Sequence, residues 1–217
     1  HKFLYDIGVV STTEPFKRLQ HVGLIMAEDG RKMSKRYGNV VNPDEIVGTY
    51  GADTFRTYEM FMGPFDQSAA WSTDNIIGTR RFIEKVWRLH TKVQKSATPT
   101  EERSRLRAQT IKKIGLDIPE FRFNTAVSSL MVLANAYDKA EAISQEEFET
   151  LIKLLAPFAP HITEDLWHTL GHTTSIHTDP WPQFDEKMYE ATTFTIGVQV
   201  NGKVRASVTV EADESAE

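Results

Sequence analysis

GRKMSKRYGN, residues 30–39, sets two lysines three positions apart in a segment bounded by glycines. Gly30 and Gly38 can adopt backbone angles that other residues avoid, so we expect a loop between them that can move. Long cationic side chains in such a loop can close over a polyanion. By composition alone, a solvated basic surface run is the simpler interpretation. The order of the residues is what favours a clamp for the phosphates of a nucleotide.

The order of residues 32–36, Lys-Met-Ser-Lys-Arg, resembles the Lys-Met-Ser-Lys-Ser signature loop of the class I aminoacyl-tRNA synthetases. Residues 38–47 and 50–56 are similar to the stretch that follows this loop in the members for leucine, isoleucine and valine. Three more stretches are similar to the bacterial leucyl-tRNA synthetases: MFMGP at 60–64, RFIEKVWRL at 81–89 and VQVNGKVR at 198–205. The chain is therefore identified as a member of that family, and as a C-terminal fragment of it.

The resemblance implies a ligase that activates leucine with ATP to leucyl-adenylate and transfers leucine to tRNA(Leu). Negative charge grows on the leaving β- and γ-phosphates, and ammonium groups beside them stabilise that transition state. The family gives this catalytic role chiefly to the second lysine, here Lys35, with Lys32 assisting. The ATP phosphates would be bound by Lys32, Met33, Ser34, Lys35 and Arg36, with Mg²⁺ accompanying ATP in the complete enzyme and no cofactor held tightly by the fragment.

Two positions of the loop carry further expectations. Ser34 would hold the conformation of the loop through hydrogen bonds of its hydroxyl group. Arg36 stands where the family signature has a serine, which adds positive charge near the phosphates and removes one hydroxyl.

The composition describes a globular protein without a membrane span. The 217 residues are 40% hydrophobic, and no run of about 18 apolar residues is present. The absence of cysteine excludes a disulfide framework and a thiolate zinc site. We expect a cytoplasmic monomer with no membrane partner.

The pattern along the chain predicts a mostly α fold in three parts. Residues 1–70 are expected to end a nucleotide-binding α/β catalytic domain, with a buried strand at 22–27 and helices at 43–47 and 52–62. Residues 71–175 are expected to form a helical bundle of the anticodon-binding type. Residues 176–217 are expected to hold a linker and a β-hairpin that begins a truncated C-terminal tRNA-binding domain.

Five helices are expected in the bundle. The first opens at 71–74 and places Phe82, Val86 and Leu89 on one apolar stripe. The second runs over 101–114. Asn124 is expected to cap the third, and Ser144 with Glu147 to make a capping box for the fourth, through Leu155. The fifth carries Ile162, Leu166 and Trp167, with His161 at its start. The hairpin strands alternate on both sides of Asn201-Gly202, a strong turn signal.

Positive charge is concentrated between Arg80 and Lys113, where eleven basic residues face three acidic ones. From Asp138 to Glu190 the balance reverses. A basic half can bind a phosphate backbone although the net charge is −5. Two ordinary solvated faces explain the charges equally well. Because the family's bundle contacts RNA, the resemblance implies contacts with tRNA phosphates by Arg80, Arg81, Lys85, Arg88 and Lys92.

The tryptophans and histidines each allow two interpretations. Trp71, Trp87, Trp167 and Trp181 can stack on bases, but Trp87 and Trp167 lie on apolar stripes that favour the core. His168 and His172 have the spacing of a metal-binding pair on a helix. Gly171 between them indicates that the helix is ending, and no cysteine completes a tetrahedral set, so we expect no metal site.

Two other functions stay open: an RNA-binding helical module without catalysis, and a synthetase for isoleucine or valine. The VNGKVR hairpin is the feature against the second. The chain lacks a His-Ile-Gly-His type motif, most of the catalytic body and any editing domain, so we expect the isolated chain not to activate leucine. Amino-acid specificity rests on the resemblance alone, because no residue can be assigned to a side-chain pocket.

Overall fold

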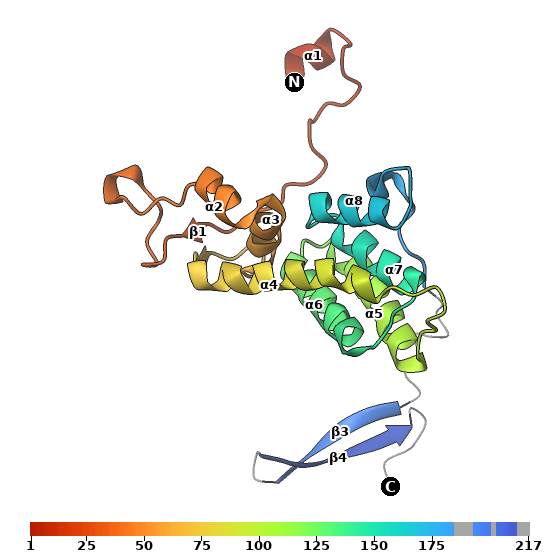
Figure 1. Ribbon diagram of the computed structural model, residues 1–217. Helices are drawn as coiled ribbons and strands as arrows, with labels where there is room; N and C mark the ends of the chain where they lie inside the picture. Colours follow the sequence, from red (N-terminus) through yellow and green to blue (C-terminus); the bar gives the residue numbers. More distant parts are fainter. Residues whose placement is uncertain (185–192, 201–202, 212–217) are drawn as a thin grey trace.

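The computed structural model describes residues 1–184, 193–200 and 203–211, which form a mostly helical protein (Figure 1). The first part of the chain contains helices α1 (Lys2–Asp6), α2 (Pro43–Tyr50) and α3 (Ala52–Phe61), the 3₁₀ turn η1 (Lys35–Tyr37) and strands β1 (Ile25–Met26) and β2 (Ala69–Ala70). The two strands pair in parallel, Ile25 with Ala69 and Met26 with Ala70. This part carries the lysine loop.

The second part is a bundle of five helices, as predicted. They are α4 (Thr73–Leu89), α5 (Glu101–Asp117), α6 (Phe123–Lys139), α7 (Gln145–Leu155) and α8 (Pro160–Thr169), with 3₁₀ turns η2 (His90–Lys92) and η3 (Ile176–Thr178). Helix α6 is central, since it packs against α3, α4, α5 and α7. Leu130, Leu133 and Tyr137 of α6 are completely buried, and this apolar core is what holds the bundle together.

Side-chain caps explain where several helices begin. The hydroxyl groups of Ser72 and Thr100 accept from backbone N–H groups in the first turns of α4 and α5. The predicted capping box is confirmed, because Ser144 and Glu147 exchange both hydrogen bonds at the start of α7. The predicted cap at Asn124 is wrong: α6 already begins at Phe123, which places Asn124 inside the first turn.

Two further predictions about burial are corrected. Residues 22–27 are not a buried strand, because only two of them pair and the side chains of Val22 and Leu24 are more than half exposed. The two-residue β1 pairs only with the equally short β2 among the described strands, so no sheet face covers these side chains. Trp87 is not in the core. Its side chain is 41% exposed, whereas Trp167 is 2% exposed as expected.

Helix α3 joins the first part of the chain to the bundle. Arg56 donates to the backbone carbonyl of Pro157 at 3.1 Å, and the Thr57 hydroxyl donates to that of Phe158 at 3.4 Å. The Asp53 carboxylate accepts from the backbone N–H groups of His161 and Ile162 at 3.3 and 2.6 Å. Helix α8 has no side-chain cap of its own, so Asp53 supplies the cap from a distant part of the chain.

The last described elements form the predicted antiparallel hairpin. Strands β3 (Thr193–Val200) and β4 (Lys203–Glu211) pair from Thr193 with Glu211 to Val200 with Lys203. The register shifts between Val198 and Gln199. The predicted Asn201-Gly202 turn, and the alternation of side chains along the strands, lie outside what the structure describes. Among the described helices, none is long and apolar enough to cross a membrane.

Candidate active-site loop and nucleic-acid interface

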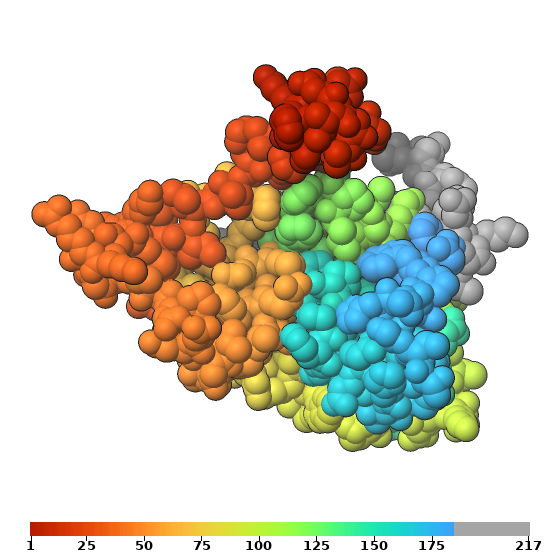
Figure 2. Space-filling view, turned by 90° about the horizontal axis from the view of Figure 1, so that it is seen from above, coloured from red at the N-terminus to blue at the C-terminus, as the bar shows by residue number. Residues whose placement is uncertain are grey.

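The lysine loop begins with a tight turn after β1. The Gly30 N–H donates to the Ala27 carbonyl at 2.8 Å, and the Ala27 N–H donates to the Arg31 carbonyl at 2.9 Å. Gly30 has φ of 74° and Gly38 has φ of 64°, the left-handed region in which glycine replaces other residues without strain. The glycines therefore bound the loop as the sequence predicted, and Figure 2 shows the corresponding orange segment projecting from the body.

Three residues hold the loop in place. The Met33 side chain packs against the small apolar cluster of Tyr58, Trp71 and Ile76. The Ser34 N–H donates to the side-chain carbonyl of Asn39 at 2.8 Å. As expected, the Ser34 hydroxyl shapes the loop: it accepts from the Arg36 N–H at 3.2 Å and so caps η1.

The loop presents three cations to solvent. Lys32, Lys35 and Arg36 are exposed, and within the described residues none of these side chains has a hydrogen-bond or ion-pair partner. Arg31 differs, because its guanidinium group contacts the Asp29 carboxylate at 2.6 Å and lies over the Tyr37 ring. Hydrogen bonds from Arg31 hold the pKa of Asp29 below its usual value. An anion entering this loop would thus meet three uncommitted positive charges.

Glu28, which the sequence analysis missed, ties the loop to the bundle. Its carboxylate accepts from the backbone N–H of Thr73 at 3.0 Å and from the Thr73 hydroxyl at 2.9 Å, at the start of α4. These two hydrogen bonds lower the pKa of Glu28, so the group is a carboxylate at neutral pH. A negative charge at a helix N-terminus is favourable. The base of the loop is therefore fixed to the first helix of the bundle.

The five predicted tRNA-binding residues fall into two groups. Arg80 donates to the Glu84 carboxylate and to the Tyr50 carbonyl, both at 2.8 Å. Lys85 donates to the side chain of Asn135, and Lys92 donates to the Asp138 and Ala140 carbonyls, which caps the end of α6. In contrast, Arg81 and Arg88 are exposed and make no ion pair within the described residues.

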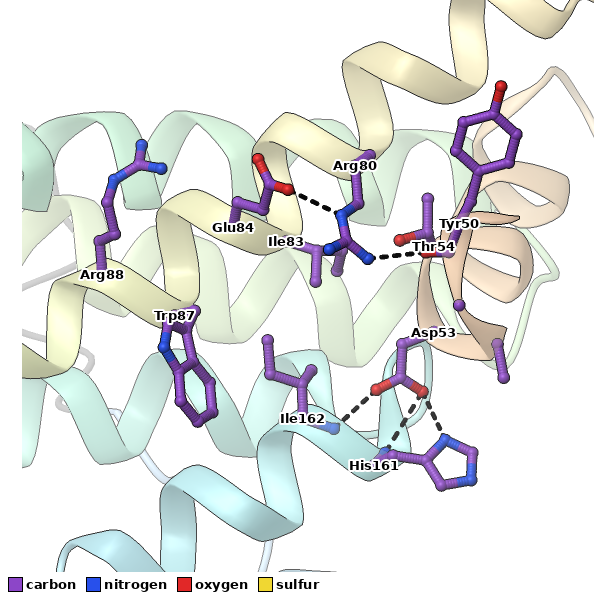
Figure 3. A pocket seen from close by; sticks show the side chains of 12 residues that line it. Tyr50, Asp53, Thr54, Arg80, Ile83, Glu84, Trp87, Arg88, His161 and Ile162 are labelled. Atoms are coloured by element: carbon purple, nitrogen blue, oxygen red, sulfur yellow. Dashed lines mark hydrogen bonds and ion pairs between the residues drawn. The ribbon is translucent and has the colours of Figure 1, made fainter. Parts of the chain in front are cut away.

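A groove of about 650 Å³ lies beside Arg88, between α4 and the beginnings of α3 and α8 (Figure 3). Ile83 and Ile162 line it, and the Trp87 indole points toward α8 across it. The Asp53 carboxylate at its end is already occupied by the N-terminus of α8. The groove thus combines an apolar lining with an arginine at its rim.

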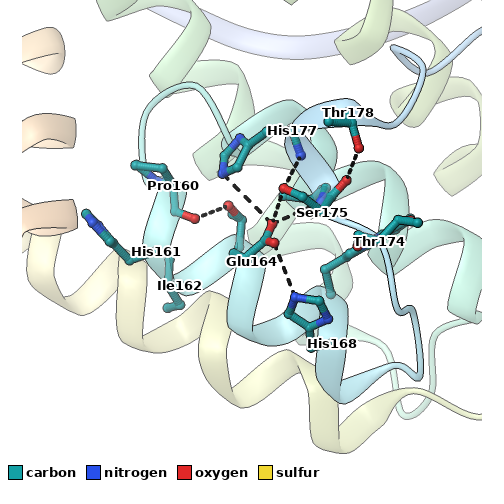
Figure 4. Close-up of polar contacts among 12 residues, drawn as sticks. Pro160, His161, Ile162, Glu164, His168, Thr174, Ser175, His177 and Thr178 are labelled. Carbon is teal, nitrogen blue, oxygen red and sulfur yellow. Dashed lines mark hydrogen bonds and ion pairs between the residues drawn. The ribbon is translucent and has the colours of Figure 1, made fainter.

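Glu164 of α8, with His168 beside it, fastens the following segment to the bundle (Figure 4). The Glu164 carboxylate accepts from the Ile176 N–H at 2.9 Å and from the Ser175 hydroxyl at 3.0 Å, and it lies 3.2 Å from a His168 ring nitrogen. Hydrogen bonds to the His172 carbonyl and to Glu164 raise the pKa of His168. Within the part of the chain that the structure describes, no group of three or more side chains could hold a metal ion.

The family model described as the anticodon-binding domain of tRNA ligase matches residues 104–217, more than half of the chain. The chain belongs to this family of tRNA ligases. A second family model, described as class I tRNA synthetases for I, L, M and V, matches residues 7–72, which include the lysine loop.

The similar relatives are leucine–tRNA ligases, which confirms the resemblance seen in the sequence. The ligase of Chlorobaculum parvum is 49% identical over all of this chain and 28% of its own length. That of Chlorobaculum tepidum is 51% identical over 95% of this chain and 26% of its own length. The chain therefore spans about a quarter of the length of these relatives.

Two solved structures are similar to the fold. One is a ternary complex of leucyl-tRNA synthetase from Agrobacterium radiobacter K84 with tRNA and LeuAMS, which is 31% identical, with a TM-score of 0.78 over 99% of this chain and 30% of that chain. The other is methionyl-tRNA synthetase from Mycobacterium tuberculosis in complex with methionyl-adenylate, which is 15% identical, with a TM-score of 0.54 over 67% of this chain and 37% of that chain. The second likeness shows the fold alone.

Proposed function

We propose that residues 1–217 form the part of a leucine–tRNA ligase that holds the phosphates of ATP and contacts tRNA(Leu). The observation that carries this proposal is the loop with three cations that have no partner among the described residues, in a chain 49% identical over its whole length to a leucine–tRNA ligase. Residues 1–70 would end the catalytic domain, 71–175 would form the tRNA-contacting bundle, and 176–217 would lead into a C-terminal tRNA-binding domain.

In this proposal the loop stabilises the leaving pyrophosphate. Lys35, assisted by Lys32, places an ammonium group where negative charge grows on the β- and γ-phosphates, and Arg36 adds a third positive charge. Met33 and Ser34 act by holding the loop that presents these cations. ATP brings Mg²⁺ with it, and the rest of the ligase supplies the leucine site. The isolated chain therefore does not activate leucine.

The RNA contacts are assigned to α4. Arg81 and Arg88 are exposed and available for phosphates, while Arg80, Lys85 and Lys92 shape the same surface through their contacts with Glu84, Asn135 and Asp138. The protein is proposed to act as a cytoplasmic monomer. Its binding to tRNA(Leu) is expected to weaken with salt, because each neutralised phosphate releases counterions.

A hybrid enzyme tests the catalytic half of the proposal. The matching part of the Chlorobaculum parvum ligase is replaced by residues 1–217, and pyrophosphate exchange is measured with leucine, isoleucine or valine as substrate. We expect exchange with leucine and none with the other two. A hybrid that folds but does not exchange pyrophosphate with leucine, or a 217-residue chain that exchanges pyrophosphate by itself, contradicts the proposal.

Filter binding of a tRNA(Leu) transcript to the 217-residue chain tests the RNA half. We expect affinity to fall steeply between about 50 and about 200 mM salt. Arg81→Gln should lower the slope of log affinity against log salt by about 1, as expected for the loss of one phosphate contact. Lys17→Gln, which removes an exposed charge outside the bundle, serves as the matched control. Binding that does not change with salt would show that the basic face of α4 does not contact phosphates.

A further inference from the structure

We propose that the groove between α3, α4 and α8 receives one unstacked base of the bound RNA, with the base stacked on Trp87 and its phosphate on Arg88. This inference rests on the proposed function, since it names a site for the tRNA that the bundle is proposed to contact. It concerns the groove in Figure 3, whose volume of about 650 Å³ lies within the usual range of ligand sites of about 300–1,000 Å³.

The environment of Trp87 differs from that of a tryptophan in the core. Trp167 is stacked on the His172 ring at a centroid distance of 3.5 Å and also lies under the Lys153 ammonium group. Trp87 makes only an edge-to-face contact with His90, at 5.5 Å, among the rings that the structure describes. An indole that is 41% exposed and not stacked on another ring has room for a parallel aromatic partner.

The apolar walls favour a base over a simple anion. Ile83 and Ile162 lie across the groove beside Trp87, and the Asp53 carboxylate and the Arg80 guanidinium group near its end already have protein partners. A free phosphate would lie close to the Asp53 and Glu84 carboxylates there, and the Nε and Nη1 groups of Arg80 already donate to Glu84 and to the Tyr50 carbonyl. A nucleobase has an apolar face for the walls and for the indole, and stacking on an aromatic side chain is how proteins hold unpaired bases.

Arg88 supplies the contact for the backbone. It follows Trp87 directly on α4, lines the same groove, is exposed, and has no partner within the described residues. A nucleotide joins a planar base to an anionic phosphate, so one residue of an RNA chain can satisfy both side chains together. Arg81, seven residues earlier on α4, is also exposed but does not line the groove.

Filter binding of the tRNA(Leu) transcript to the full 217-residue chain tests this site. Trp87→Ala should weaken binding by about 5- to 140-fold, the loss expected for one stacked base, while Trp87→Phe should stay within about 3-fold. Trp181→Ala is the matched control, because Trp181 is similarly exposed but lies against α5 near Gly115. The Trp181→Ala chain should bind tRNA(Leu) as tightly as the unmodified chain.

Tryptophan fluorescence gives a second readout that does not depend on the stability of the alanine variant. RNA should quench part of the emission of the unmodified chain, and Trp87→Phe should remove that part while affinity is retained. A Trp87→Ala chain that binds tRNA as tightly as the unmodified chain, with the salt dependence intact, overturns the base site and leaves the proposed function standing. A chain that binds no tRNA overturns both.

Another segment of the ligase could cover the groove in place of RNA. The accessibility of Trp87 to a quencher in the hybrid enzyme tests this alternative. Without RNA, acrylamide should quench Trp87 in the hybrid as strongly as in the 217-residue chain. An indole shielded in the hybrid before RNA is added would mean that protein covers the groove, which contradicts the inference.

Discussion

Replacing Asp53 by alanine should weaken the connection between α3 and α8 and lower the free energy of unfolding. The Asp53 carboxylate caps α8 from α3, with its oxygens 3.3 Å from the His161 nitrogen and 2.6 Å from the Ile162 nitrogen, and its side chain is 10% exposed. A hydrogen bond to a charged acceptor contributes about 1.5–3 kcal/mol, and loss of a helix cap typically costs about 1 kcal/mol. The His161 ring contact adds little, because that side chain is 73% exposed.

We therefore expect Asp53→Ala to lower the free energy of unfolding by about 2–4 kcal/mol, which for a chain of this size corresponds to about 4–16 °C in Tm. Asp53→Asn should lose about half as much, because the amide keeps one acceptor oxygen. Urea unfolding followed by circular dichroism at 222 nm measures both. Asp66→Ala, a substitution at an exposed carboxylate, is the control and should stay within about 0.5 kcal/mol. A loss below about 0.5 kcal/mol for Asp53→Ala would show that the Asp53 cap does not stabilise α8.

Two further predictions concern buried polar groups in the bundle. Burial would raise the pKa of Asp117, but hydrogen bonds from Lys113, Thr125 and Arg122 bring it below its usual value. This group therefore contributes stability that is present above pH about 4 and is lost as the pH falls further; Asp117→Asn should remove that dependence in acid unfolding curves, and an unchanged curve would contradict it. The Tyr137 hydroxyl is buried with no hydrogen-bond partner among the described residues, so Tyr137→Phe should change the free energy of unfolding by less than about 1 kcal/mol, whereas a larger loss in urea would reveal a partner.

Features encoded locally were predictable from the sequence. The capping box of Ser144 and Glu147 needs only two residues three positions apart, and the glycines that bound the lysine loop follow from their backbone freedom. The predicted cap at Asn124 was wrong because a capping side chain is only one way to begin a helix. Helix α6 follows Phe121, which has a left-handed φ of 57°, and Arg122, whose N–H donates to the Asp117 carbonyl.

Features that depend on distant residues could not be found in one sequence. The Glu28 cap on α4 spans 45 positions and the Asp53 cap on α8 spans 108, so neither leaves a local pattern. Trp87 continues the apolar stripe of α4, yet the neighbouring surface toward α8 is a groove and not a packed layer. The family resemblance implies a tRNA contact for Lys92, and only the structure shows its hydrogen bonds to the end of α6.

Lys35→Ala in the hybrid ligase tests whether the lysine loop acts on the leaving pyrophosphate. Leucine-dependent pyrophosphate exchange should lose about 100- to 1,000-fold in kcat, with a smaller change in KM for ATP, because the ammonium group acts mainly in the transition state. Lys17→Ala, outside the loop, should exchange at the unmodified rate. Exchange by Lys35→Ala within about 3-fold of the unmodified hybrid would mean that Lys35 does not stabilise the leaving pyrophosphate.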